Sequence, residues 1–291
     1  MRSEKEMMEL FLETARTDAR IRAATLEGSR TNPNVPRDLF QDYDISYLVS
    51  ELESFKADSS WIDRFGERLL LQTPEAMELF PAELGRRFSY LILFEDGNKL
   101  DLTLIPADEA EVYVTEDKLM QVLLDKDGLF PNVSPSTDED YHVQRPSEAL
   151  FSDCRNEFWM TSTYVAKGLW RREILFALDH LNEIMRPMLL QMLEWKVGFE
   201  TGFSLSVGKN RKYLESCVSA DTWDGLMQTY PGSSYVEIWE ALFAAAKLFR
   251  ETGEEVARHL GCPYPTSEDE RMTEYLRQVV ELPREAQSFP R

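Results

Sequence analysis

The spacing of apolar residues changes partway along the chain. Up to about residue 130 the apolar residues form short runs with the spacing expected of strands. Before the first run, Ser3 and Glu6 match the capping-box pattern, which predicts a helix at the start of the chain. The expected strands cover residues 21–26, 44–49, 68–71, 90–94, 100–105 and 122–124.

The clearest of these signals is a hairpin. Residues 90–94 and 100–105 are both apolar runs, and Asp96-Gly97 lies between them, a pair that favours a tight turn. Because strand residues alternate between faces, Asp101 and Thr103 should point away from the core. The buried face would then carry Leu100, Leu102 and Leu104.

Residues 125–146 are rich in Pro, Asp, Ser and Gly, which is typical of a linker. Beyond them the apolar spacing becomes helical almost throughout. A long helix is expected over 172–196, and Pro187 should kink or break it. We therefore predict an α+β protein, with a mixed β-sheet domain carrying helices over residues 1–135 and an α-helical bundle over 136–291. Further helices are expected near residues 209–217, 220–229, 236–250 and 267–280.

The composition limits the cellular location and the kinds of partner that the protein can have. No apolar run approaches the ~18 residues needed to cross a membrane, and the charged N-terminus does not resemble a secretory signal. The three cysteines are far apart, which favours reduced thiols and a cytoplasmic location. The net charge of -20 disfavours nucleic acid as a partner and is compatible with a polycationic one, although solubility alone also explains such a charge. We expect a monomer.

Three pieces of the first domain together suggest a chemistry. Gly28-Ser29-Arg30 follows an expected strand, Asp42 and Asp44 lie where the next strand begins, and Asp101 lies on the hairpin. Carboxylates on neighbouring strands of one sheet can meet at one point, where they repel each other unless a cation lies between them. Oxygen ligands of this kind suit Mg²⁺ that also binds phosphate, and the Gly-Ser turn lets backbone and hydroxyl groups approach a phosphate.

Each piece alone has an ordinary explanation. Gly-Ser marks many turns, Asp-x-Asp is usually a solvated loop edge, and Asp101 could simply face water. The ordered set is more specific, and it favours a nucleotidyltransferase site. The Gly-x4-Gly-Lys pattern of a P-loop is absent.

Longer strings carry a family resemblance. The chain resembles the bacterial aminoglycoside 6-adenylyltransferases, also called streptomycin adenylyltransferases, over roughly residues 1–250. The strings that carry it are Leu26-Glu27-Gly28-Ser29-Arg30-Thr31-Asn32, Phe40-Gln41-Asp42-Tyr43-Asp44-Ile45-Ser46, Met77 to Pro81 with Glu83-Leu84-Gly85, Phe94 to Pro106, Asn156 to Met160, and Asp179 to Ile184 with Arg186-Pro187.

The resemblance implies a nucleotidyltransferase-like first domain and a helical second domain, with the active site in the cleft between them. By carry-over, Asp42 and Asp44 bind magnesium, and Asp101 is a metal ligand, the general base, or both. ATP is the co-substrate, and its contacts are expected at Gly28, Ser29, Arg30 and Lys167.

The second domain is expected to bind the antibiotic. Streptomycin carries guanidinium groups, for which carboxylates such as Glu157 and Asp179 are natural partners. Trp159 could stack on a sugar or guanidinium. For each of these residues alone, a surface or core role is about as plausible.

Other functions remain open at this stage. The acceptor could be another antibiotic or a protein side chain. The chain could also be a non-catalytic nucleotide- or drug-binding relative, or an acidic chaperone-like protein.

Overall fold

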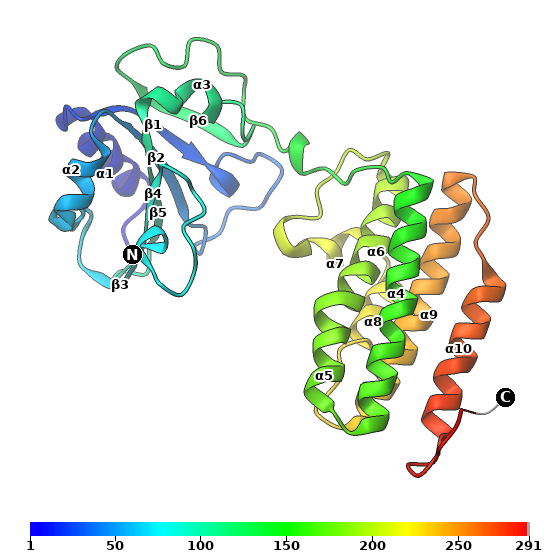
Figure 1. The fold of residues 1–291 in the computed structure, drawn as a ribbon. Coiled ribbons are helices and arrows are strands. Elements are labelled where there is room, and N and C mark those ends of the chain that lie inside the picture. Colours follow the sequence, from blue (N-terminus) through cyan, green and yellow to red (C-terminus); the bar gives the residue numbers. More distant parts are fainter. Residues whose placement is uncertain (290–291) are drawn as a thin grey trace. The chain divides into compact units, whose positions relative to one another are not determined.

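The computed structural model describes residues 1–289, and it divides into two compact units, Met1–Asp140 and Tyr141–Arg291. The first is built on a sheet and the second on helices (Figure 1). This confirms the predicted α+β class. The domain boundary expected after residue 135 lies close to the division between the units.

The first unit contains one six-stranded mixed sheet in the order β3-β4-β5-β2-β1-β6. The central strands β2 and β5 are parallel, and the other neighbouring pairs are antiparallel. Its strands are β1 (Ile21–Glu27), β2 (Tyr43–Val49), β3 (Arg68–Gln72), β4 (Phe88–Phe94), β5 (Lys99–Pro106) and β6 (Met120–Asp125). Its helices are α1 (Glu4–Thr17), α2 (Leu52–Ala57) and α3 (Ala110–Tyr113).

One face of the sheet packs on α1. That helix begins with the expected capping box, in which Ser3 and Glu6 satisfy each other's backbone N–H groups. The hydroxyl of Tyr47 donates to the carbonyl of Phe11 over 2.8 Å, which ties β2 to α1 inside the core. Leu100, Leu102 and Leu104 are fully buried on this face, as predicted from the alternation along the hairpin strand.

The opposite face is covered over only part of its width. A smaller core, which includes Ala23, Leu48 and Ile105, lies beneath α3. Next to it in the sheet, where β2 and β5 begin, this face carries polar side chains. The fold therefore leaves a polar strip on the sheet, formed by adjacent strands.

The second unit is an α-helical bundle with one core. Its helices are α4 (Glu148–Arg171), α5 (Ile174–Asp179), α6 (Arg186–Thr201), α7 (Leu214–Cys217), α8 (Ala220–Met227), α9 (Tyr235–Leu260) and α10 (Thr266–Glu281). The rings of Phe158 and Phe249 stack with centroids 3.7 Å apart and join α4 to α9.

The helix expected over 172–196 is interrupted as predicted, but in a particular way. Between α5 and α6 the chain forms a π-helical segment, His180–Met185, and Pro187 lies in the first turn of α6. Proline has no N–H to donate, so a helix that passes through it must rearrange the preceding turn. The wider π turn makes that adjustment.

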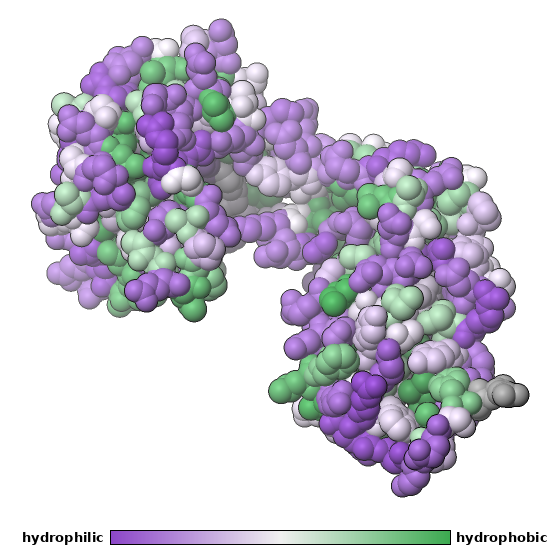
Figure 2. Space-filling view, viewed as in Figure 1, coloured by the Kyte–Doolittle hydropathy of each residue, from purple (hydrophilic) through white to green (hydrophobic). Residues whose placement is uncertain are grey.

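The visible surface of each unit is mostly hydrophilic, with apolar residues scattered over it (Figure 2). Within residues 1–289, no helix combines the length and apolar character that a membrane span requires.

Candidate active site

The register of three adjacent strands places acids side by side. Asp44 on β2 is paired with Asp101 on β5 and with Glu27 on β1. Paired residues on neighbouring strands point to the same face, so these three form one line across the sheet, which we call the acid row. Asp42 lies two residues before Asp44, just outside β2.

A row of hydroxyl groups lies next to the acid row. Moving two residues along each strand keeps the same face, and the register pairs these positions across four strands. The row consists of Thr25, Ser46, Thr103 and Ser89. The acids thus lie at the outer edge of a polar strip, away from the apolar contacts beneath α3.

Gly28 fits tightly against the acid row. Its φ is +67°, a left-handed conformation that residues with a side chain rarely adopt. A Cβ at this position would lie 2.5 Å from Oδ2 of Asp44. The glycine is therefore needed both for the turn and for the close approach of backbone and carboxylate.

Lys99 connects two of the predicted acids. Its ammonium lies 2.7 Å from Oδ2 of Asp42 and 2.7 Å from Oδ1 of Asp101. Burial opposes its charge, yet hydrogen bonds to Asp101 and Asp42 raise the pKa of Lys99 above its usual value. The ammonium thus holds together two carboxylates that come from different strands.

The negative charges of the neighbouring acids act strongly on Asp44. Burial first, and then the charges of Asp101, Asp42 and Glu27, raise the pKa of Asp44 to about 6. Carboxylates in this arrangement need a positive partner to remain ionised together.

These residues fit a hard divalent cation such as Mg²⁺. Within residues 1–289 Asp44 forms no ion pair, although Asp101, Asp42 and Glu27 lie close enough to raise its pKa. Oxygen donors of this kind are the ligands Mg²⁺ prefers. In the described part of the chain, no three acidic, His or Cys side chains already stand as a metal-holding group, and the Lys99 ammonium lies between Asp42 and Asp101.

Glu27 is held in place from the side. The hydroxyl of Tyr113 on α3 donates to Glu27, and the hydroxyl of Thr25 donates to the same carboxylate over 3.2 Å. Burial and the nearby Glu27 charge raise the pKa of Tyr113, so this phenol stays a donor. Glu27 is thereby fixed beside Asp44.

Ser29 and Arg30 form a 3₁₀ turn with Gly28 directly after β1. Ser29 is half-buried beside the acid row. Arg30 is turned inward and is only 7% exposed. Its guanidinium donates to the carbonyls of Gln41 (2.7 Å) and Asp42 (2.9 Å) and lies over the ring of Tyr43.

The expected role of Arg30 as a nucleotide contact therefore needs correction. A guanidinium that is buried and already hydrogen-bonded is not available to a phosphate. In this structure Arg30 positions the backbone that leads into β2, and with it Asp42.

The expected residues of the second unit lie on its helices. Glu157 on α4 and Asp179 at the end of α5 are exposed, and Glu157 accepts a hydrogen bond from Thr161 over 3.3 Å. The ammonium of Lys167 lies 4.4 Å from the ring centroid of Tyr164. Trp159 is only 2% exposed and packs against Phe158 and Phe249, so its ring faces are not open to a ligand here.

Sequence reasoning missed Lys99 and Glu27. Both belong to the patterns that identified the other residues, because Lys99 lies two positions before Asp101 and Glu27 directly precedes Gly28. Period-two alternation would have placed Lys99 on the face of Asp101. Its contact with Asp42 also requires the pairing of β2 with β5, which the local pattern does not contain.

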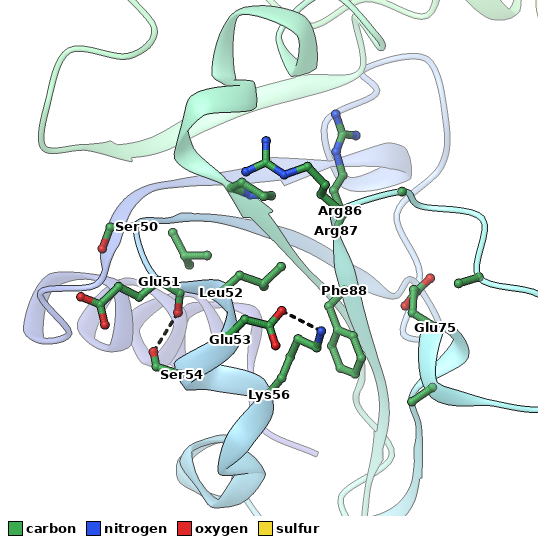
Figure 3. A pocket seen from close by; sticks show the side chains of 15 residues that line it. Ser50, Glu51, Leu52, Glu53, Ser54, Lys56, Glu75, Arg86, Arg87 and Phe88 are labelled. Carbon is green, nitrogen blue, oxygen red and sulfur yellow. Dashed lines mark hydrogen bonds and ion pairs between the residues drawn. The ribbon is translucent and has the colours of Figure 1, made fainter.

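The first unit also contains a cavity that is separate from the acid row (Figure 3). It has a volume of about 910 Å³ and is reached by Val49 and Pro106, at the far ends of β2 and β5. Five residues of extended strand, about 16 Å, separate Asp44 from Val49. Several charged groups there pair with each other or with neighbours, such as Lys56 with Glu53 and Arg86 with Asp108. None of the predicted site residues lines this cavity.

Comparisons with known proteins find relatives along almost the whole chain. The family model described as streptomycin adenylyltransferase matches residues 1–279. An aminoglycoside 6-adenylyltransferase of Bacillus subtilis (strain 168) is 54% identical over 276 residues, which is 94% of this chain and 97% of the relative. One from Campylobacter jejuni is 51% identical over 95% of each chain, and one from Staphylococcus aureus is 42% identical over 92% of this chain and 95% of its own.

A solved structure is also similar. The crystal structure of an aminoglycoside 6-adenyltransferase from Bacillus subtilis has 50% sequence identity, with a TM-score of 0.48 over 96% of this chain and 99% of its own. The family match spans almost the whole chain, and the relatives are far above the identity at which family membership becomes uncertain. The chain therefore belongs to the streptomycin adenylyltransferase family of nucleotidyltransferases.

Proposed function

We propose that the protein transfers AMP from ATP to a hydroxyl group of an aminoglycoside of the streptomycin type, with the help of Mg²⁺, and releases pyrophosphate. The relatives are named as aminoglycoside 6-adenylyltransferases, which supports the reaction class. The observation that carries the proposal is the pairing of Asp44 with Asp101 on adjacent parallel strands, with Gly28 packed against Asp44.

Two acids serve the cation. Asp42 and Asp44 would hold Mg²⁺ through their carboxylate oxygens, as expected for a cation that is shared with phosphates. When bound, the cation neutralises the charge of the phosphate chain and of the departing pyrophosphate. Ser29, on the turn next to Asp44, donates its hydroxyl to a phosphate oxygen.

Asp101 acts on the acceptor. It accepts the proton of the antibiotic hydroxyl as the hydroxyl oxygen forms its bond to the α-phosphorus. The bond between the α-phosphorus and its bridging oxygen breaks at the same time, and pyrophosphate leaves with that oxygen. A general base of this kind contributes ~10²–10⁴ in rate.

The helical unit recognises the antibiotic in this proposal. Glu157 and Asp179 are exposed carboxylates and can each form paired hydrogen bonds with a guanidinium group. Lys167 is assigned to a phosphate. Because its ring is buried, Trp159 is the least supported of the expected contacts.

Pyrophosphate release tests the proposal. Purified protein with MgATP is mixed with streptomycin, with kanamycin, or with no drug, and the amount of pyrophosphate released is measured. Release with streptomycin only is the expected result. Release with kanamycin alone would mean that the protein catalyses the same reaction on a different antibiotic. No release with either drug, despite ATP binding, would refute the aminoglycoside acceptor.

A further inference from the structure

Lys99 has a position that the expected chemistry does not explain. A lysine among metal-binding acids is unusual, because it contributes a positive charge where a cation is to bind. Here its ammonium lies 2.7 Å from an oxygen of Asp42 and 2.7 Å from an oxygen of Asp101. It also lies on β5, two residues before Asp101, so the strand itself directs both side chains to one face.

The ammonium and a metal ion would use the same oxygen atoms. Mg²⁺ binds carboxylate oxygens at about 2.0–2.1 Å and demands a nearly octahedral set of ligands. A nitrogen at hydrogen-bond distance from those oxygens occupies the lone pairs that the cation needs. The two positive groups also repel each other at such separations.

The carboxylates around Lys99 explain why a positive side chain at this position stabilises the site. Glu27, Asp42, Asp44 and Asp101 converge at one edge of the sheet. Within residues 1–289, Lys99 is the basic side chain that forms ion pairs with two of them, Asp42 and Asp101. Without a cation, these carboxylates would repel each other and spread the ends of β2 and β5. Lys99 is 38% exposed and lies on a flexible stem, so it can move away without disturbing the core.

We propose that Lys99 is a built-in counter-ion that holds Asp42 and Asp101 together in the metal-free enzyme and is displaced when a divalent cation enters. It is a positioning residue that competes with the metal. The inference rests on the proposed function for the use of a divalent cation, and it adds a residue that controls how tightly this cation binds before the nucleotide arrives.

Direct metal binding tests the role of Lys99 without reference to turnover. Mn²⁺ is titrated into the full-length protein without nucleotide or drug, and free Mn²⁺ is counted by electron paramagnetic resonance. Lys99→Gln removes the competing ammonium, so Mn²⁺ should bind up to about fivefold more tightly than to the original protein. The metal-free variant should also melt at a lower temperature, and saturating Mn²⁺ should raise its Tm more than that of the original protein.

Two further variants serve as controls. Lys56→Gln removes one positive charge that pairs with Glu53 on α2, which follows the far end of β2, and corrects for the change in net charge. Lys99→Arg keeps the charge and can bridge two carboxylates in a fixed fork, so it should bind Mn²⁺ no more tightly than the original protein. This second variant keeps the test decisive if Lys99→Gln does not fold.

The outcomes are distinct. Unchanged or weaker Mn²⁺ binding by Lys99→Gln, with binding by the original protein intact, overturns the competing role of Lys99 and leaves the proposed reaction standing. Tighter binding by Lys99→Arg overturns it as well. Absence of Mn²⁺ binding in every protein overturns both the counter-ion role and the metal site.

Discussion

A Cβ placed on Gly28 would lie 2.5 Å from Oδ2 of Asp44, so the turn after β1 and the acid row are in direct contact. Gly28→Ala should therefore displace Asp44 as well as strain the backbone. The positive φ costs about 1–2 kcal/mol for a residue with a side chain. Adenylyl transfer, measured as pyrophosphate release, should fall by more than about a hundredfold because the displaced carboxylate is part of the site.

Gly85 provides a matched control for this prediction. Its φ is +64°, and a Cβ there would meet no atom within 4 Å. Gly85→Ala should lower the Tm by a few degrees at most, about 3 °C per kcal/mol, and leave turnover nearly unchanged. Equal losses of activity in the two variants would show that contact with Asp44 is not the reason for the glycine.

Most of the sheet could be predicted because its signal is local. The Asp96-Gly97 turn and the alternation over Leu100, Leu102 and Leu104 specify a hairpin and its buried face without reference to the rest of the chain. The capping box at Ser3 is local in the same sense. The break before Pro187 was expected too, but its π-helical form depends on how the bundle packs around it.

The site was less predictable because its contacts join distant segments. Lys99 meets Asp42 only through the parallel pairing of β2 with β5, across 57 positions of sequence. Arg30 follows the Gly-Ser turn and therefore resembled a ligand contact, yet its guanidinium satisfies backbone carbonyls instead. Burial of Trp159 likewise follows from the packing of α4 on α9, which periodicity alone does not resolve.

Asp44 should make stability depend on pH. Its pKa is about 6 in the folded protein against an ordinary value of 3.8, so between these values the folded state binds more protons than the unfolded state. The contribution of Asp44 to stability therefore falls as pH rises from about 4 to about 6. Asp44→Asn removes that loss, and its metal-free Tm should exceed that of the original protein at pH 7.5.

The two melting temperatures should converge toward pH 4. Thermal melts across pH 4–8, in a chelating buffer, measure the difference. Asp38→Asn, at an exposed position in the loop before Asp42, should have nearly the same Tm as the original protein at every pH. A difference for Asp44→Asn that does not change with pH would contradict the assigned cause.

Asp101→Asn should abolish turnover and leave the fold intact. The amide cannot accept the proton of the sugar hydroxyl, so kcat should fall by at least ~10²–10⁴. The far-ultraviolet circular dichroism spectrum should stay close to that of the original protein, because Leu100 and Leu102 still anchor the strand. Near-normal turnover would remove Asp101 from its role as base.

Arg30→Lys should weaken the hydrogen bonds that hold the backbone of Asp42 in place. The planar guanidinium of Arg30 donates to the carbonyls of Gln41 and Asp42 through two nitrogens that are fixed relative to each other. A lysine ammonium has no such fork and cannot make both hydrogen bonds in the same geometry. We expect a loss of about 1–3 kcal/mol in the free energy of unfolding, measured with urea. Arg37→Lys, at an exposed arginine in the same loop, should cost much less. Comparable losses would show that Arg30 does not support the site.

Glu157→Gln should weaken antibiotic binding more than ATP binding. Glutamine keeps the shape of the side chain but loses the charge that makes its hydrogen bonds to a guanidinium strong, so the Kd for streptomycin should rise about tenfold. Calorimetric titration with streptomycin and, separately, with MgATP gives both constants. Glu240→Gln on α9, another exposed position on the helical unit, controls for the loss of one negative charge from this acidic protein. Equal weakening in both variants would indicate general attraction between the polycationic drug and the acidic surface. A specific loss in Glu157→Gln, with the Kd for MgATP unchanged, would assign this carboxylate to the antibiotic, because a nucleotide contact or a folding defect would alter both constants.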